Sequence, residues 1–227
     1  MTIELARSAE ALNLRLDLGS GDHPRPGFES VDFFAPSAKH QVNLCRFPWP
    51  WADGSVAELF CSHFVEHIPM AYVAADGKTY RIVPEEPTDR DLFTAFFDEC
   101  HRILKPGGKM TVLVPCAWND RGFQDPTHRR FLVRSSWAYL SKAWREMHGL
   151  GHYLGGCDFE VSVDAKGSPG EELFHKEVQQ KRYGHWINTV DDWKVDLKAI
   201  KGAPKALPEA FPGVGATPMV IAEAPTK

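Results

Sequence analysis

The stretch Leu14–Phe34, LRLDLGSGDHPRPGFESVDFF, decides how this chain folds. It begins with LRLDL (residues 14–18), in which apolar and polar residues alternate as in a short strand. The run GSG (residues 19–21) follows directly, and its two glycines allow a ligand to approach the backbone closely. A second short run, ESVDFF (residues 29–34), places Asp32 near a strand end, where a carboxylate can accept hydrogen bonds from both hydroxyls of a ribose. The stretch therefore predicts a nucleoside site.

The residues after the glycines argue against a dinucleotide ligand. A dinucleotide fingerprint needs a third glycine, a helix that opens at the turn, and an acid about 20 residues later. In this chain Pro24 occupies the third glycine position, Pro24 and Pro26 oppose a helix, and Asp32 comes early. Without a helix N-terminus to hold a pyrophosphate, the stretch favours a nucleoside without a diphosphate over NAD or FAD.

Length and composition suit one globular domain. The chain has 227 residues, of which 43% are hydrophobic and 25% charged. A formal net charge of −4 gives no global field that attracts nucleic acid, and no apolar run approaches the ~18 residues of a membrane span. We expect one domain over residues 1–202, with an insertion at about 70–91, and a Pro/Gly-rich tail over 203–227.

The cysteines and the N-terminus bear on the compartment. The five cysteines are odd in number and have no C-x-x-C spacing, so we expect neither a disulfide framework nor a four-cysteine zinc site. The N-terminal residues lack the apolar core of a signal peptide. Together these features predict a cytoplasmic protein with buried free thiols.

Predicted strands and helices alternate along the chain. We expect strands at residues 14–18, 29–34, 41–44, 56–62, 109–115, 159–165 and 193–200. We expect helices after residue 63 and over residues 91–104, 135–147 and 171–183. This order predicts the α/β class, with a Rossmann-like, mostly parallel, seven-stranded sheet and helices on both faces. The connection from the first strand to the second is short for a parallel crossover, which normally needs about a dozen residues.

Three blocks carry a family resemblance: LDLGSG…GFESVD, VNLCRFPWPWADGSVAELFCSHFVEHI and FFDECHRILKPGGKMTVLVP. In this order they resemble class I S-adenosylmethionine-dependent methyltransferases, in the type 11-like form with a short first helix. The resemblance covers about residues 14–135 and implies S-adenosylmethionine as the cofactor of a methyl transfer. It implies cofactor-binding roles for nine residues: Asp17, Gly19, Ser20, Gly21, Asp32, Asn43, Leu44, Ser62 and His63. Asn43 stands where the family usually carries an acid that bonds the adenine amino group.

The loop after the predicted strand at 109–115 is the candidate acceptor site. We expect His128 or Asp125 to act as the catalytic base, and Arg129 and Arg130 to bind an anionic group of the substrate. Similar methyltransferases often carry a D-P-T-H sequence here. The alternative is an ordinary solvated loop. We expect the acceptor to be a small molecule, such as a sugar or a nucleotide, whose identity the sequence leaves open.

Three other functions remain open. His63, Glu66 and His67 fit the H-x-x-E-H signature of zinc peptidases, and on a helix the two histidines would share a face. Pro69 cuts this segment short and the sequence offers no third ligand, so we expect no metal. The chain could also be a non-catalytic cofactor-binding protein. Finally, the basic and aromatic residues around Lys181 would suit a nucleic-acid methyltransferase, which the composition does not favour.

Overall fold

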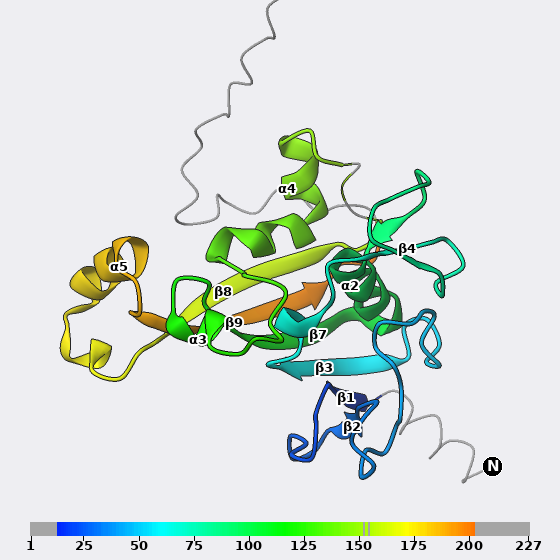
Figure 1. The fold of residues 1–227 in the computed structure, drawn as a ribbon, viewed down its shortest axis with the longest axis horizontal. Coiled ribbons are helices and arrows are strands. Elements are labelled where there is room, and N and C mark those ends of the chain that lie inside the picture. Colours follow the sequence, from blue (N-terminus) through cyan, green and yellow to red (C-terminus); the bar gives the residue numbers. More distant parts are fainter. Residues whose placement is uncertain (1–12, 152, 154, 203–227) are drawn as a thin grey trace, which may run out of the picture.

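The computed structural model of this chain describes residues 13–151, 153 and 155–202. Its centre is a six-stranded sheet in the order β2-β1-β3-β7-β9-β8 (Figure 1). The strands are β1 (Leu14–Leu18), β2 (Glu29–Val31), β3 (Val56–Ser62), β7 (Leu104–Pro115), β8 (Phe159–Gly167) and β9 (Val190–Ala199). The strands β2, β1, β3 and β7 run parallel, and β9 runs antiparallel to both of its neighbours. The predicted mostly parallel α/β sheet is confirmed.

The sheet has six strands rather than seven, because the predicted strand at 41–44 does not form. Only an isolated parallel bridge, between Val31 and His40, extends the sheet in that direction. The side chain of Asn43 accepts a hydrogen bond from the amide of Cys45 over 2.9 Å, and its carbonyl accepts one from Arg46 over 3.0 Å. These local bonds make a turn, and a side chain that satisfies the backbone in this way competes with a strand.

The connection from β1 to β2 contains no helix, as its prolines predicted. Arg25 lies across the outer face of β3 instead, with its guanidinium carbon 4.2 Å from the centre of the Phe60 ring. Arg15 sits in the same way over Phe28, at 4.2 Å. Two cation–π contacts therefore cover this part of the sheet where a crossover helix would otherwise lie.

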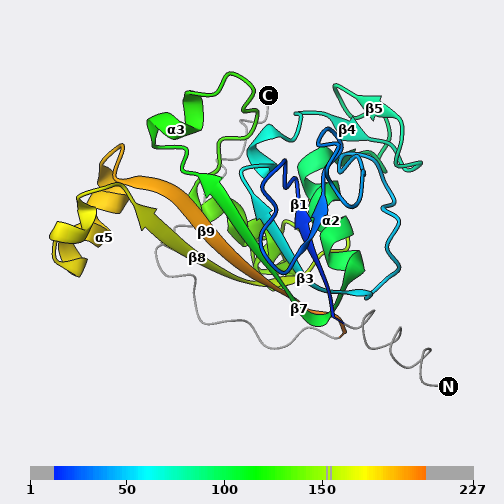
Figure 2. The ribbon, with the colours of Figure 1, turned by 90° about the horizontal axis from the view of Figure 1, so that it is seen from below.

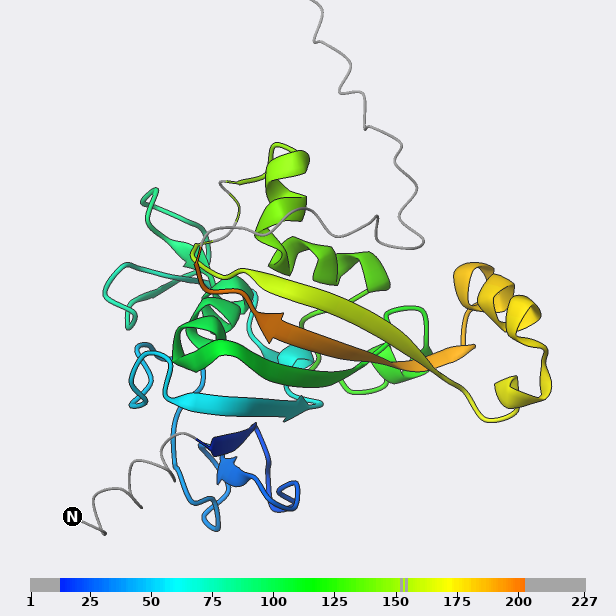
Figure 3. The same ribbon diagram turned by 180° about the vertical axis from the view of Figure 1, so that it is seen from behind.

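Helices cover one face of the sheet in the part of the chain that the structure describes. They are α2 (Leu92–Ile103), the 3₁₀ helix η2 (Arg134–Leu140) and α4 (Lys142–Met147). Phe97 of α2 contacts Trp137 of η2, with ring centres 6.0 Å apart. Figure 3 shows the opposite face, where no described helix crosses the strands. The expected helices on both faces are thus present on one face, because the first crossover is too short to carry a helix.

Other predictions need smaller corrections. The predicted helix over 135–147 is interrupted at Ser141, whose hydroxyl accepts a hydrogen bond from Trp144 and caps α4. The helix expected after residue 63 is a single 3₁₀ turn, η1 (Val65–His67). Strand β7 begins at Leu104, before the predicted strand at 109–115, and its pairing with β3 jumps from Val56↔Leu104 to Glu58↔Lys109, as at a bulge.

The insertion forms a small antiparallel sheet, in the order β5-β4-β6. Its strands are β4 (Tyr72–Val73), β5 (Tyr80–Arg81) and β6 (Arg90–Asp91). Strands β4 and β5 pair antiparallel as a hairpin, and the chain turns between them at Asp76 and Gly77.

The remaining elements lie near the carboxyl ends of β3 and β7. The short helix α3 (Asp120–Phe123) follows β7, and η3 (Glu171–Leu173) and α5 (Lys176–His185) connect β8 to β9. Figure 2 shows α5 projecting beyond the sheet on the same side as α3. None of the described helices is long and apolar enough to span a membrane. The five cysteines are free thiols.

Candidate functional site

The glycine turn after β1 is tied to the end of β2. The amides of Gly19 and Ser20 both donate to the carbonyl of Val31, over 2.8 and 3.3 Å. Gly19 has φ of +70°, and a Cβ built there would lie 2.6 Å from the ring of Phe64. This position therefore needs glycine for its backbone conformation and for the close approach of Phe64.

Asp32 holds the other side of this turn. Its Oδ2 accepts a hydrogen bond from the amide of Gly21 over 3.0 Å. Its Oδ1 accepts from the amides of Phe34 and Ala35, over 2.7 and 2.9 Å. Burial raises the pKa of Asp32, but these three backbone bonds outweigh it and hold the pKa below its usual value. Because a carboxylate accepts about four hydrogen bonds, Asp32 retains room for one ribose hydroxyl rather than the two expected.

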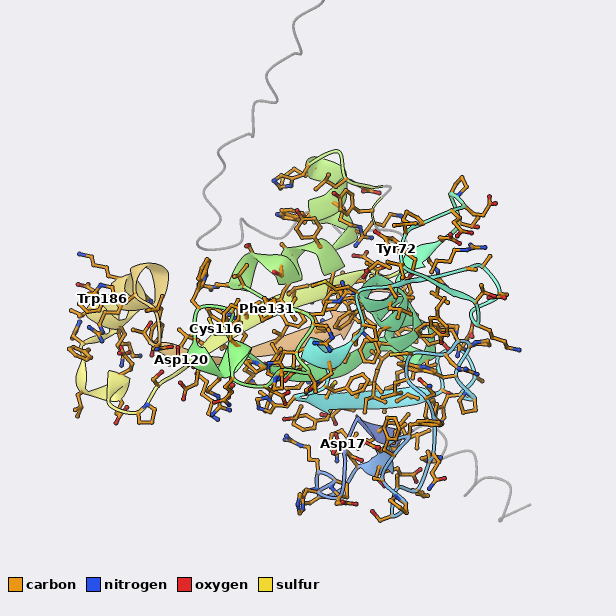
Figure 4. All side chains as sticks on the ribbon, viewed as in Figure 1. Asp17, Tyr72, Cys116, Asp120, Phe131 and Trp186 are labelled. Atoms are coloured by element: carbon orange, nitrogen blue, oxygen red, sulfur yellow. The ribbon has the colours of Figure 1, made fainter. Side chains whose placement is uncertain are left out.

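A pocket of about 350 Å³ opens beside the glycine turn. It is lined by Asp17, Gly19, Ser20, His23, Pro24, Arg25, Pro26, Phe60 and Ser62. The carboxylate of Asp17 accepts a hydrogen bond from the amide of Arg25 over 2.7 Å. Burial raises the pKa of Asp17, and the bond from Arg25 opposes that shift. The pocket thus holds a buried acid at the carboxyl ends of β1 and β3, where ligands of parallel sheets bind. Figure 4 labels Asp17 on β1, with Cys116 and Asp120 after β7.

Five of the nine predicted cofactor contacts lie outside the lining of this pocket: Gly21, Asp32, Asn43, Leu44 and His63. Leu44 is 4% exposed and belongs to the hydrophobic core. Asn43 uses one lone pair of its amide oxygen in the local bond to Cys45. The structure therefore groups Asp17, Gly19, Ser20 and Ser62 in one pocket and leaves Asn43 and Leu44 apart from it.

His63 begins a second group of side chains at the end of β3. It has φ of 52°, a left-handed conformation that few residues other than glycine adopt. Its Nδ1 lies 3.3 Å from Oε1 of Glu66. The nearby carboxylate of Glu66 raises the pKa of His63, although burial opposes the shift. His63 is therefore turned toward η1 and pairs with a buried acid.

The predicted acceptor loop packs against η1. The amides of Arg129 and Arg130 both donate to the carbonyl of Glu66, over 2.7 and 3.0 Å. The hydroxyl of Thr127 lies 3.0 Å from Nδ1 of His67. The rings of His67 and His128 meet edge to face, with their centres 4.8 Å apart. The loop after β7 and the turn after β3 thus form one unit.

Within this loop His128 is a better base than Asp125. Oδ1 of Asp125 accepts hydrogen bonds from the hydroxyl and the amide of Thr127, both over 2.7 Å, and these bonds lower the pKa of Asp125. Nδ1 of His128 lies 2.8 Å from the carbonyl of Gly122, so this nitrogen carries the proton. Nε2 of His128 is then the unprotonated nitrogen, able to accept a proton or bind a cation.

The two arginines of the loop differ in what they contact. Arg130 donates to the carbonyls of Ile68 and Pro69, over 3.1 and 2.7 Å, and pairs with Asp91 at 2.9 Å. Its guanidinium therefore joins the loop to residues just before the insertion and to Asp91 within it, and its expected role in substrate binding stays a prediction. Arg129 is exposed and makes two hydrogen bonds, both from Nη1, to carbonyls of its own loop. Arg129 retains its other donors for an anion.

Two other features lie away from this region. A hollow of about 430 Å³ is lined by charged residues of the uncovered sheet face, including Glu58, Lys109 and Lys198, near the amino ends of β3 and β7. In α5, Arg182 pairs with Glu171 at 2.7 Å and lies 4.6 Å from the centre of the Trp186 ring. Its charge is already compensated, so this arrangement adds no support for a nucleic-acid surface.

Sequence analysis missed the meeting of Glu66 and His67 with His128. His63 and His67 were considered as the two zinc ligands of a signature that includes Glu66, whereas His128 was considered as a base in a separate loop. One ligand atom of each residue lies within 4.8 Å of the other two. The two segments follow β3 and β7, and adjacent parallel strands bring their carboxyl ends to the same edge. That adjacency was the signal that could have joined them.

Comparisons with known proteins show which solved structures share this architecture. No family model matches the sequence, and a comparison with curated proteins also gives no match. Among solved structures, a SAM-dependent methyltransferase from Archaeoglobus fulgidus matches with a TM-score of 0.51 and 15% identity, over 86% of this chain and 91% of that chain. A SAM-dependent methyltransferase from Methanosarcina mazei matches with a TM-score of 0.48 and 12% identity, over 84% of this chain and 93% of that chain.

The Archaeoglobus structure shares the mostly parallel sheet over most of both chains, at an identity that informs on fold alone. This agrees with the strand order described above. The chain has the fold of the class I S-adenosylmethionine-dependent methyltransferases.

Proposed function

We propose that this chain is an S-adenosylmethionine-dependent methyltransferase that acts on a small-molecule acceptor. The observation that carries the proposal is the pocket at the carboxyl ends of β1 and β3, with the buried Asp17 and the glycine turn in its wall. Asp32 adds an acid on the other side of the same turn. S-adenosylmethionine is a nucleoside that carries an amino acid. It needs a pocket with polar groups for the amino acid and an acid that can bind the ribose.

The residues of the pocket fit this cofactor. The carboxylate of Asp17 can pair with an ammonium group, and the hydroxyl of Ser62 and the backbone at Gly19 and Ser20 supply neutral polar contacts. The remaining lone pair of Asp32 can accept one ribose hydroxyl. When bound, S-adenosylmethionine supplies a methyl group on a positively charged sulfur, which is already electrophilic. The protein then needs mainly to position the acceptor and receive its proton.

Residues of the loop after β7 would serve the acceptor. Nε2 of His128 offers a lone pair at the same edge of the sheet, and the side chain of His128 is 7% exposed. Arg129 is placed to bind an anionic group of the acceptor. His63, next to Ser62, links the pocket to this loop through Glu66. Asn43 and Leu44 lie outside the pocket, so this proposal gives them no contact with the cofactor.

Calorimetry with S-adenosylhomocysteine and with NAD tests the cofactor. We expect binding of the first and none of the second. A screen of sugar, nucleotide and small-acid pools with methyl-labelled S-adenosylmethionine then tests transfer. Binding without transfer to any acceptor would favour a non-catalytic cofactor-binding protein. Absence of S-adenosylhomocysteine binding by a folded protein would contradict the proposal.

A further inference from the structure

We infer that Glu66, His67 and His128 form a binding site for a divalent transition-metal ion, for which Zn²⁺ is the reference. Each residue offers one ligand atom, and these three atoms lie within 4.8 Å of one another. Ligands bonded to one ion at about 2.1 Å lie at most about 4.2 Å apart, so the side chains need only small rotations to close on it. This reverses the expectation of no metal, which rested on the lack of a third ligand.

The carboxylate of Glu66 is the strongest sign that the cluster binds a cation. Glu66 is 1% exposed, and neither of its side-chain oxygens has a hydrogen-bond partner. Its one ion-pair contact among the described residues is with His63, whose Nδ1 lies 3.3 Å from Oε1. An ionised carboxylate taken out of water costs several kcal/mol unless a partner compensates it. A cation between Glu66 and the two histidines would provide that compensation.

Hydrogen bonds around the two histidines leave the right nitrogens free. The hydroxyl of Thr127 donates its hydrogen bond to Asp125 over 2.7 Å, so at 3.0 Å it accepts a hydrogen bond from the N–H at Nδ1 of His67. Nδ1 of His128 donates to the carbonyl of Gly122 over 2.8 Å. In each histidine, Nε2 is therefore the unprotonated nitrogen, with a lone pair for an ion. A carboxylate or carbonyl that accepts the second N–H is the usual support of a metal-bound histidine.

The ligand types select the class of ion. Two imidazoles and one carboxylate suit Zn²⁺ and its first-row neighbours, whereas Mg²⁺ and Ca²⁺ prefer sites made of oxygen atoms. Oδ2 of Asp125 lies 4.0 Å from Nε2 of His128 and adds negative charge beside the site. Three protein ligands leave at least one coordination position for water or for a ligand oxygen.

The place of the cluster suggests what the ion would do, and this role rests on the proposed function. The loop that supplies His128 is the predicted acceptor loop, and η1 follows Ser62 of the cofactor pocket after two residues. An ion held there would bind and orient an acceptor oxygen at the carboxyl edge of the sheet. His128 would then act as a ligand of the ion rather than as a free base.

Zinc binding by the full chain, purified without a histidine tag and treated with a chelator, tests the site. We expect calorimetry and elemental analysis to give one Zn²⁺ per chain, with a rise in the unfolding temperature as Zn²⁺ is added. His67→Ala, His128→Ala and Glu66→Gln should each weaken binding at least about a hundredfold. His148→Ala is the matched control, because His148 lies outside the cluster in α4's C-terminal cap and should leave Zn²⁺ affinity unchanged.

Thr127 gives a second comparison that does not remove a ligand. Thr127→Ala frees Nδ1 of His67 and should weaken Zn²⁺ binding about tenfold or more, whereas Thr127→Ser keeps the hydroxyl and should restore it. Circular dichroism confirms that each variant is folded. Equal Zn²⁺ affinity in wild type, His67→Ala and His128→Ala, or well under one Zn²⁺ per wild-type chain, would overturn the site. Calorimetry with S-adenosylhomocysteine on the same samples shows separately whether the proposed function fails.

Discussion

The amide of Gly21 and Oδ2 of Asp32 are joined by a hydrogen bond of 3.0 Å, which couples the glycine turn to the end of β2. The same carboxylate caps the amides of Phe34 and Ala35. One side chain thus shapes both walls of the region proposed to hold a ribose. Any ligand that contacts Asp32 therefore meets an acid whose position is already set.

The first prediction is that Asp32→Ala weakens S-adenosylhomocysteine binding about tenfold to a hundredfold. The loss corresponds to ~1.5–3 kcal/mol, the usual size of one hydrogen bond to a charged group. Asp22→Ala is the matched control, since Asp22 lies in the same turn and its carboxylate accepts only from Ser37 among the described contacts. Calorimetry on both folded variants makes the comparison. Unchanged affinity in Asp32→Ala would remove Asp32 from the site.

The second prediction concerns the pH dependence that Asp32 adds to stability. Burial raises the pKa of Asp32, but the three backbone hydrogen bonds outweigh it and hold the pKa below its usual value. The carboxylate of Asp32 therefore binds a proton more tightly in the unfolded chain than in the folded one. The stabilising contribution is therefore present above about pH 4 and is lost as the pH falls through the folded pKa. Urea unfolding of wild type and Asp32→Asn at several pH values measures this. The gap between the two proteins should narrow toward acid pH, and a gap that widens would contradict the assignment.

The third prediction separates the two glycines of the turn. Gly19→Ala should lower the free energy of unfolding by about 2–4 kcal/mol, because φ is +70° and the new methyl group would meet the Phe64 ring. Gly21→Ala should cost only about 1 kcal/mol, since φ is +53° but no atom lies within 4 Å of the added carbon. Chemical denaturation of the two variants checks this order. Equal losses would mean that Phe64 moves away freely.

The fourth prediction concerns the ion pair between Glu99 and Arg102, which holds the segment FPWPW at residues 47–51. Glu99 is 7% exposed, and its carboxylate accepts from the amide of Trp49 and from Arg102, each over 2.6 Å. Glu99→Ala should cost about 3 kcal/mol, because it leaves buried donors without a partner. Asp53 pairs with the same Arg102 but its side chain is 80% exposed, so Asp53→Ala should cost under about 1 kcal/mol. Thermal and urea unfolding measure both.

The fifth prediction applies once an acceptor is known. His128→Ala should lower turnover about a hundredfold or more and change cofactor affinity less than about threefold. Asp125→Ala should have a smaller effect, because Asp125 acts through Thr127 and has a lowered pKa. Arg129→Ala should mainly raise the Michaelis constant of an anionic acceptor. Steady-state kinetics with each variant provide the test, and wild-type turnover in both His128→Ala and Asp125→Ala would show that the loop is a solvated connection.

Local patterns in the sequence were enough for the elements that depend on neighbouring residues. The alternation at 14–18 and the apolar run at 56–62 predicted β1 and β3 with their observed bounds, and the apolar stripe before Lys105 predicted α2. The glycines and Asp32 predicted a turn coupled to a strand end. In these cases the pattern itself carries the physical cause, which is burial of one face or the need for a backbone without a side chain.

Tertiary structure decided what local patterns could not express. Arg130 became a clamp because the carbonyls of Ile68 and Pro69 and the carboxylate of Asp91 lie around its guanidinium. His67 and His128 meet because β3 and β7 pair in parallel, so the segments that follow them leave the sheet at one edge. Which strands become neighbours depends on how the whole chain buries its core, and no spacing within either segment contains that information.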